Sequence, residues 1–154
     1  MTDNNQVYYY MNSSGSLELE AGDKSVVRNM LASQYSPTDL QIYYDSTPKL
    51  TGTGETDILY QEGDVPGSYN GYTWCDDPVA TYVCDQTVVR IEGGGYYKPG
   101  LSCHETGHAV GLTHGADAYP RRNQRDSILG CMETPTDDLT PLGANQRNNI
   151  NAYY

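Results

Sequence analysis

Residues 104–114 read HETGHAVGLTH and carry more information than any other part of the chain. The chain has three histidines, and all three, His104, His108 and His114, fall in this stretch. On a helix, His104 and His108 project from the same face one turn apart, so both imidazoles can bind one metal ion. Gly111 lets the chain turn sharply after the helix, so that His114 can return as a third ligand. The spacing therefore predicts a site for one metal ion.

The number of ligands suggests which metal binds. Three protein ligands and one open position are typical of a catalytic zinc site, whereas a structural zinc site usually has a fourth protein ligand, often Cys. We therefore predict one catalytic Zn²⁺, held by His104, His108 and His114. Glu105 can reach a water molecule bound to that ion and is the predicted general base. HExxH alone arises by chance in helices that bind nothing, but the added Gly and third His make the pattern more specific.

The full pattern, HExxHxxGxxH, resembles the signature of the metzincin clan of zinc metallopeptidases. That clan has a methionine-containing turn downstream of the third histidine, and Met132 in the segment GCMETP (130–135) lies at a suitable distance. The chain is similar in small size to the snapalysin-type enzymes, but those have Asp as third ligand where this chain has His114. Gly115, which follows the third ligand, does not match the better-known families. The resemblance is specific over residues 103–135 and leaves the family open.

Side-chain patterns predict five strands and three helices. The strands are expected at residues 6–11, 40–44, 57–60, 69–75 and 86–91, and the helices at 23–34 (capped by Asp23 or Ser25), at 99–110, and after the cap Thr140, with Pro141 at the first position. The first strand, helix and second strand suggest a βαβ unit with parallel strands. Residues 1–154 are expected to form a single domain.

This order of elements matches the metzincin fold, so the resemblance implies an α+β, zincin-like fold. In that fold, a twisted and mostly parallel sheet carries a backing helix and an active-site helix, and a small C-terminal part with a final helix follows. One antiparallel strand lines the cleft, and an extended peptide can pair with its open edge. Residues 69–74 are our candidate for that strand.

The resemblance also implies a pocket for the substrate side chain that follows the scissile bond. It would lie between the active-site helix and residues 133–136, below a wall formed around Val110 and Leu112. An apolar lining favours a large apolar side chain, because burial of apolar surface stabilises the complex. Glu133 would favour a basic side chain instead if it points inward.

Four cysteines, at positions 75, 84, 103 and 131, are typical of a disulfide-bonded extracellular protein. Cys75 and Cys84 are close in sequence and are expected to pair and close one loop. In the metzincin fold, the positions of Cys103 and Cys131 lie near each other under the metal, so the resemblance implies the second pair. Zinc bound by cysteine is the alternative, but no CxxC spacing supports it.

The chain is acidic, with 20 Asp and Glu against 9 Lys and Arg and a formal net charge of −11. This charge argues against binding to nucleic acid or to an anionic membrane surface. No apolar stretch approaches the length of a membrane span, and no signal peptide is visible, which suggests a mature or trimmed form. We expect a secreted, extracellular monomer.

These observations predict a secreted zinc-dependent metalloendopeptidase that acts on a peptide or protein substrate. Two alternatives stay open: a zinc-binding module that docks a peptide without cutting it, and a secreted effector protease with narrow specificity. Glu105 argues against the docking module, because such a module does not need a base.

Two further sites are weaker. Some metzincins add a Tyr near the metal, and Tyr119 is the candidate here, although a loop or pocket-wall role is commoner for such a residue. Glu62, Asp64 and Asn70 could form a Ca²⁺ site, although acidic, Gly-rich loops are usually only solvated turns.

Overall fold

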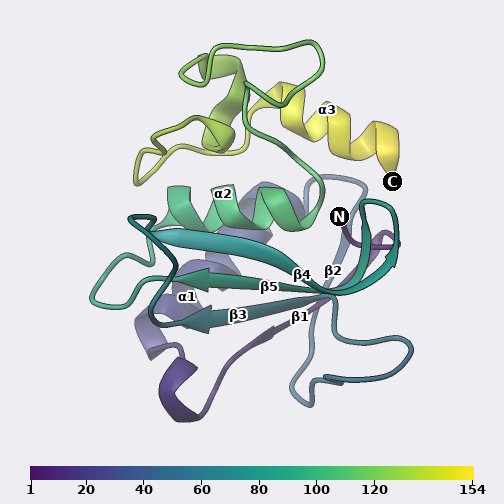
Figure 1. The fold of residues 1–154 in the computed structure, drawn as a ribbon, viewed down its shortest axis with the longest axis vertical. Helices are drawn as coiled ribbons and strands as arrows, with labels where there is room; N and C mark the ends of the chain where they lie inside the picture. The colour runs from purple at the N-terminus through teal and green to yellow at the C-terminus, as the bar shows by residue number, and fades with distance from the viewer.

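The computed structural model describes residues 1–154 and has an α+β architecture, with helices packed on a five-stranded, mostly parallel sheet (Figure 1). The strands are β1 (Gln6–Met11), β2 (Gln41–Tyr44), β3 (Ile58–Glu62), β4 (Gly71–Ala80) and β5 (Val83–Ile91). Their order is β2-β1-β3-β5-β4. Strand β1 pairs in parallel with β2 and β3, β3 pairs in parallel with β5, and edge strand β4 is antiparallel to β5. The predicted strands and the parallel β1–β2 pair are confirmed.

The helices are α1 (Ala21–Met30), α2 (Pro99–Ala109) and α3 (Ala144–Tyr153), with short helical segments η1 (Gly15–Leu17), η2 (Leu31–Tyr35) and η3 (Ser127–Met132). Helix α1 continues directly into the π-helical η2, so the two together span the predicted first helix. The predicted caps are wrong. Glu20 is the N-cap without a side-chain hydrogen bond, and the Ser25 hydroxyl donates to the carbonyl of Ala21 instead.

The last helix begins later than predicted. It starts at Ala144, after the N-cap Gly143, and not at Pro141. The backbone before it is engaged elsewhere, because the Pro141 carbonyl accepts from Cys131 N (2.9 Å) and Leu142 N donates to Gln34 Oε1 (3.0 Å). These contacts hold Pro141 and Leu142 in an extended connection. Tyr153, near the end of this helix, is largely exposed.

The hydrophobic core joins one face of the sheet to helices α1 and α2 and to the C-terminal part of the chain. Its buried side chains form one cluster, which includes Tyr9, Tyr60 and Val89 from the sheet, Val27 and Met30 from α1, Cys103 and Ala109 from α2, and Met132, Leu142 and Ile150 from the C-terminal part. Helix α2 consequently lies between the sheet and residues 115–154 (Figure 1). In this arrangement, one side of α2 is left facing a cleft.

Both predicted disulfides are present, and no cysteine is free. Cys103–Cys131 joins α2 to η3. Cys75–Cys84 crosses the β4–β5 hairpin, so the expectation of a loop between these cysteines is wrong. The strands extend to a tight turn at residues 81–82, and the irregular register between Cys75 and Ala80 places the two cysteines side by side. None of the helices has the length and apolar character needed to cross a membrane.

Candidate metal centre

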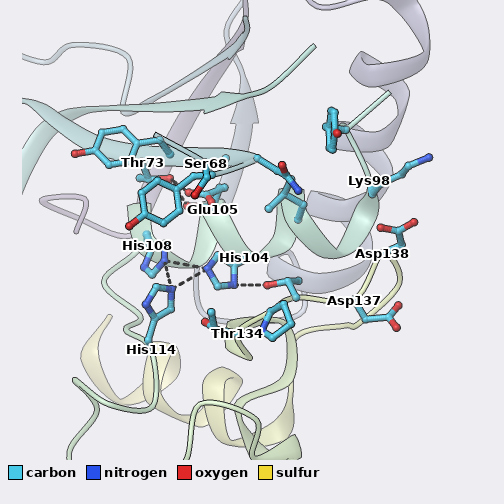
Figure 2. Close-up of a pocket in the computed structure, with 18 of the residues that line it drawn as sticks. Ser68, Thr73, Lys98, His104, Glu105, His108, His114, Thr134, Asp137 and Asp138 are labelled. Carbon is cyan, nitrogen blue, oxygen red and sulfur yellow. Dashed lines mark hydrogen bonds between the residues drawn. The ribbon is translucent and has the colours of Figure 1, made fainter. Parts of the chain in front are cut away.

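The three histidines converge through their Nε2 atoms (Figure 2). His104 and His108 project from α2, and the chain then turns at Gly111, whose φ of 94° is in the left-handed region that favours glycine. This turn returns His114 to the same point. The Nε2 atoms are 3.2 Å apart for His104 and His108, 2.9 Å for His104 and His114, and 3.1 Å for His108 and His114. The sequence-predicted ligand set is therefore brought together in space.

The other ring nitrogens show which Nε2 atoms carry a lone pair. His104 Nδ1 lies 2.7 Å from the Cys131 carbonyl oxygen, and His108 Nδ1 lies 3.0 Å from that of Leu112. A carbonyl only accepts, so each Nδ1 must carry the hydrogen. In a neutral imidazole, Nε2 then has a free lone pair.

Two lone pairs facing each other cannot form a hydrogen bond. The 3.2 Å contact between the Nε2 atoms of His104 and His108 is therefore repulsive unless a cation lies between them. His114 adds a third Nε2 to the same point, and the three atoms lie within 4.8 Å of one another. This donor set could hold a metal ion.

Burial keeps the first two imidazoles neutral. It lowers the pKa of His104 to about 3, helped by the neighbouring His108, and it lowers the pKa of His108 to about 4, helped by His114. Metal binding needs the neutral form of histidine, because a protonated Nε2 has no lone pair to offer. His104 and His108 are thus in their ligating form at neutral pH.

Glu105 lies beside the histidines but is not part of their group. The residue is buried, and burial raises the pKa of its carboxyl to about 7, while a hydrogen bond from Thr73 lowers it. The Thr73 hydroxyl lies 2.6 Å from Glu105 Oε2. A carboxyl with a pKa near neutrality can both accept and return a proton, as a general acid–base group must.

The histidines and Glu105 open into a cleft of about 860 Å³ (Figure 2). Its other lining residues come mainly from residues 68–73, 94–98 and 134–138. The antiparallel edge strand β4 begins at Gly71, so the prediction that residues around 69–74 line the cleft is confirmed for Tyr69, Tyr72 and their neighbours. Few of the residues that line the cleft are hydrophobic, and Lys98, Asp137 and Asp138 lie at one end.

The predicted apolar wall of this cleft is wrong. Val110 and Leu112 instead line a separate cavity of about 320 Å³ together with residues of α3. The reason is that His104 and His108 occupy the cleft side of α2, so the apolar residues that follow the helix turn toward α3. Glu133 is also absent from the cleft lining, whereas Thr134, Pro135 and Thr136 belong to it as predicted.

The remaining predicted residues are placed as follows. Met132 is fully buried against α2, and its sulfur occupies the space where a side chain at Gly107 would lie. Tyr119 is fully exposed and lines the separate cavity, so it does not lie beside the metal site.

The calcium site predicted at Glu62, Asp64 and Asn70 stays a prediction. Asn70 lines the metal cleft, and its backbone carbonyl accepts from Glu92 N. The carboxylates that do approach one another within 4.8 Å are Glu55, Asp77 and Asp85, and such acidic groups are common without an ion.

Sequence reasoning missed Thr73 and Thr136. The Thr136 hydroxyl lies 2.7 Å from His104 Nδ1 and donates to the Glu133 carbonyl (2.8 Å), so it is free to accept from the imidazole. Both threonines lie 32 residues from the residue they contact, and no local spacing marks them.

No protein-family model matches the chain, and no match is found among curated proteins. Functional inference therefore depends on the chemistry of the metal centre and its cleft.

Proposed function

We propose that the chain is a secreted zinc-dependent metalloendopeptidase with a zincin-like fold of the metzincin type. The observation that carries the proposal is the convergence of His104, His108 and His114 beside a buried carboxyl, Glu105, in an open cleft. Three imidazoles and a free fourth position suit a catalytic Zn²⁺. At a Zn–N distance of about 2.0–2.1 Å, tetrahedral nitrogens lie about 3.4 Å apart, slightly more than the separations found here.

A zinc ion bound there would lower the pKa of a water ligand and polarise the substrate carbonyl. Glu105 would accept a proton from the attacking water and pass it to the leaving nitrogen. One residue then serves both proton transfers, and no nucleophilic side chain is needed. The raised pKa of Glu105 supports this role, because the carboxyl binds and releases a proton near neutral pH.

The edge strand β4 supports a peptide substrate. It is the last strand of the sheet and lines the cleft, so its outer edge can pair with an extended peptide through backbone hydrogen bonds. Secretion is supported by the two disulfides, which persist in oxidising compartments.

The proposal is tested by zinc analysis and a casein digest of three proteins: wild type, His108→Ala and Glu105→Ala. Wild type should bind one zinc per chain and lose its proteolytic activity in a chelator. His108→Ala should lose zinc. Glu105→Ala should keep zinc yet lose activity by roughly 10²–10⁴-fold, the usual contribution of general acid–base catalysis.

Two results would contradict the proposal. If Glu105→Ala cleaves casein at the wild-type rate, the mechanism is wrong. If wild type binds zinc but cleaves neither casein nor any peptide of a diverse library, the docking module becomes the better account.

A further inference from the structure

Strand β4 makes a direct contact with the carboxylate of Glu105. The Thr73 hydroxyl donates to Glu105 Oε2 at 2.6 Å and lies 3.0 Å from the backbone carbonyl of the same residue. It is the only hydrogen-bond partner of that carboxylate. Figure 2 shows Thr73 and Glu105 together above the histidines. A hydrogen bond to an ionised acceptor is about twice as strong as a neutral one, so this contact restrains the Glu105 side chain.

Gly71 is a second and independent feature of β4, beside the other oxygen of Glu105. A Cβ atom built at Gly71 would lie 2.6 Å from Glu105 Oε1 and 2.8 Å from its Cγ. Real Cβ atoms do not approach other atoms so closely, so any side chain here would displace the carboxylate. The backbone of β4 therefore closes over Glu105 because position 71 has no side chain.

The placement of both residues follows from the register of β4. Gly71 and Thr73 are two positions apart and face the same side of the sheet. They pair with Ile91 and Val89 of β5, both of which are fully buried in the core beneath the sheet. The pairing of β4 with β5 therefore fixes the position of β4 relative to α2, and with it the distance from Thr73 to Glu105.

We propose that Thr73 is a positioning residue for Glu105, and that Gly71 leaves the space in which the held carboxylate fits. Strand β4 then has two tasks, since it borders the cleft and also fixes the base. Without the hydroxyl, the Glu105 side chain would distribute over several rotamers, and fewer of them would face the attacking water. This inference rests on the proposed function, because it assigns Glu105 a proton-transfer role.

The test compares Thr73→Val and Thr73→Ser with wild type in zinc content, kcat and KM on a fluorogenic peptide selected from the casein digest. Val keeps the shape of Thr and removes the hydroxyl, whereas Ser keeps the hydroxyl. Thr73→Val should lower kcat by roughly 10- to 100-fold, the usual range for partners that orient catalytic-site groups, with KM and zinc content nearly unchanged. Thr73→Ser should restore most of kcat.

Thr87→Val is the matched control. Thr87 lies on neighbouring strand β5 and outside the cleft. The control should keep the wild-type kcat, which separates loss of the Glu105 contact from general loss of a strand hydroxyl.

Gly71→Ala tests the same inference without changing Thr73. It should keep zinc, lower kcat, and show a displaced Glu105 carboxylate in a crystal structure. The structural readout does not depend on activity, and it decides the role of Gly71 even if Thr73→Val does not fold.

The outcomes separate this inference from the proposed function. A wild-type protein that binds zinc without cleaving peptides contradicts the proposed function itself. An active wild type whose Thr73→Val variant keeps full kcat overturns the role of Thr73. A Thr73→Ser variant as impaired as Thr73→Val does the same, because the hydroxyl would then not be the cause. A Gly71→Ala structure with Glu105 unmoved overturns the role of Gly71.

Discussion

His104 is held at Nδ1 by two acceptors, one in η3 and one in the segment that follows it. The Cys131 carbonyl and the Thr136 hydroxyl each lie 2.7 Å from that nitrogen. Two acceptors fix both the tautomer and the rotation of the ring, and so they aim Nε2 at the metal position. Partners of this kind commonly contribute about 10- to 100-fold in metal affinity or activity.

Thr136→Val should weaken zinc binding, because the imidazole loses one of its two acceptors while the side-chain shape is kept. We expect a loss of about 10-fold in affinity, at the lower end of the usual range, since the Cys131 carbonyl remains. Competition with a chromogenic chelator measures the affinity directly.

Thr134→Val is the matched control, because it removes a hydroxyl from the same segment that is buried and has no hydrogen-bond partner. Its zinc affinity should equal that of wild type. Equal affinities in the Thr134 and Thr136 variants would show that Thr136 does not orient His104.

Whether a residue of the site could be predicted from the sequence depends on how far it lies along the chain from the residues it contacts. His104, Glu105 and His108 could be assigned from sequence because helical geometry alone places positions i and i+4 on one face. Thr73 and Thr136 could not, since their contacts with α2 arise only when β4 and the C-terminal segment pack against it.

At the scale of elements, α2 is fixed to its surroundings by buried polar contacts. The Tyr35 hydroxyl donates to the Cys103 carbonyl (2.6 Å), and the Tyr60 hydroxyl lies 2.8 Å from Thr106 Oγ1. The Cys103–Cys131 bond joins the same turn of α2 to η3. Since Cys131 also supplies an acceptor for His104, the disulfide couples the position of η3 to the metal ligands.

Removal of this disulfide should affect metal binding as well as stability. In Cys103→Ala/Cys131→Ala, we expect a loss of about 2–4 kcal/mol in the free energy of unfolding, the typical contribution of a disulfide. Zinc affinity should also fall, because the Cys131 carbonyl is no longer tied to α2. Urea unfolding and chelator competition measure the two effects.

The Cys75→Ala/Cys84→Ala variant is the comparison. This second disulfide crosses the β4–β5 hairpin and lines a cavity that His108 also borders, but neither of its cysteines supplies a hydrogen bond to a ligand histidine. Its removal should therefore lower stability without changing zinc affinity. The same zinc affinity in both double variants would contradict the proposed coupling.

Some helices and strands could be predicted from the local sequence, and others could not. The strands and the ligand-bearing helix were predictable because apolar patterns and β-formers mark them. The start of α3 was not, because the hydrogen bonds of Pro141 and Leu142 to distant segments override the local signal of Pro at a first helical position. The pocket wall expected around Val110 and Leu112 was misplaced for a similar reason, since Val110 is buried in the core and both residues border the cavity beside α3.

For the molecule as a whole, the acidic net charge and the charged residues of the cleft both favour cationic ligands. The net charge is −11, and the cleft contains Asp137 and Asp138 against Lys98. The Asp138 carboxylate is exposed and makes no ion pair. A negative protein attracts cationic ligands and repels anionic ones, most strongly in a cleft and at low ionic strength.

Cationic peptides should therefore be cleaved faster than anionic peptides of the same length. We expect a difference of about 10-fold in kcat/KM at low salt, at the lower end of the range for electrostatic steering, and a smaller difference in 0.5 M NaCl. A peptide library with basic or acidic residues on either side of the scissile bond, digested at both salt concentrations and read by mass spectrometry, measures the preference.

Two variants that each remove one negative charge distinguish the cleft from the overall charge. Asp138→Asn changes the end of the cleft, whereas Asp39→Asn changes an exposed carboxylate outside it. If the cleft sets the preference, Asp138→Asn should reduce it at the positions bound near residues 134–138, and Asp39→Asn should leave it unchanged. Equal effects of the two variants would assign the preference to the net charge alone. Preferred cleavage beside large apolar residues, independent of salt, would contradict a cleft that selects its substrates by charge.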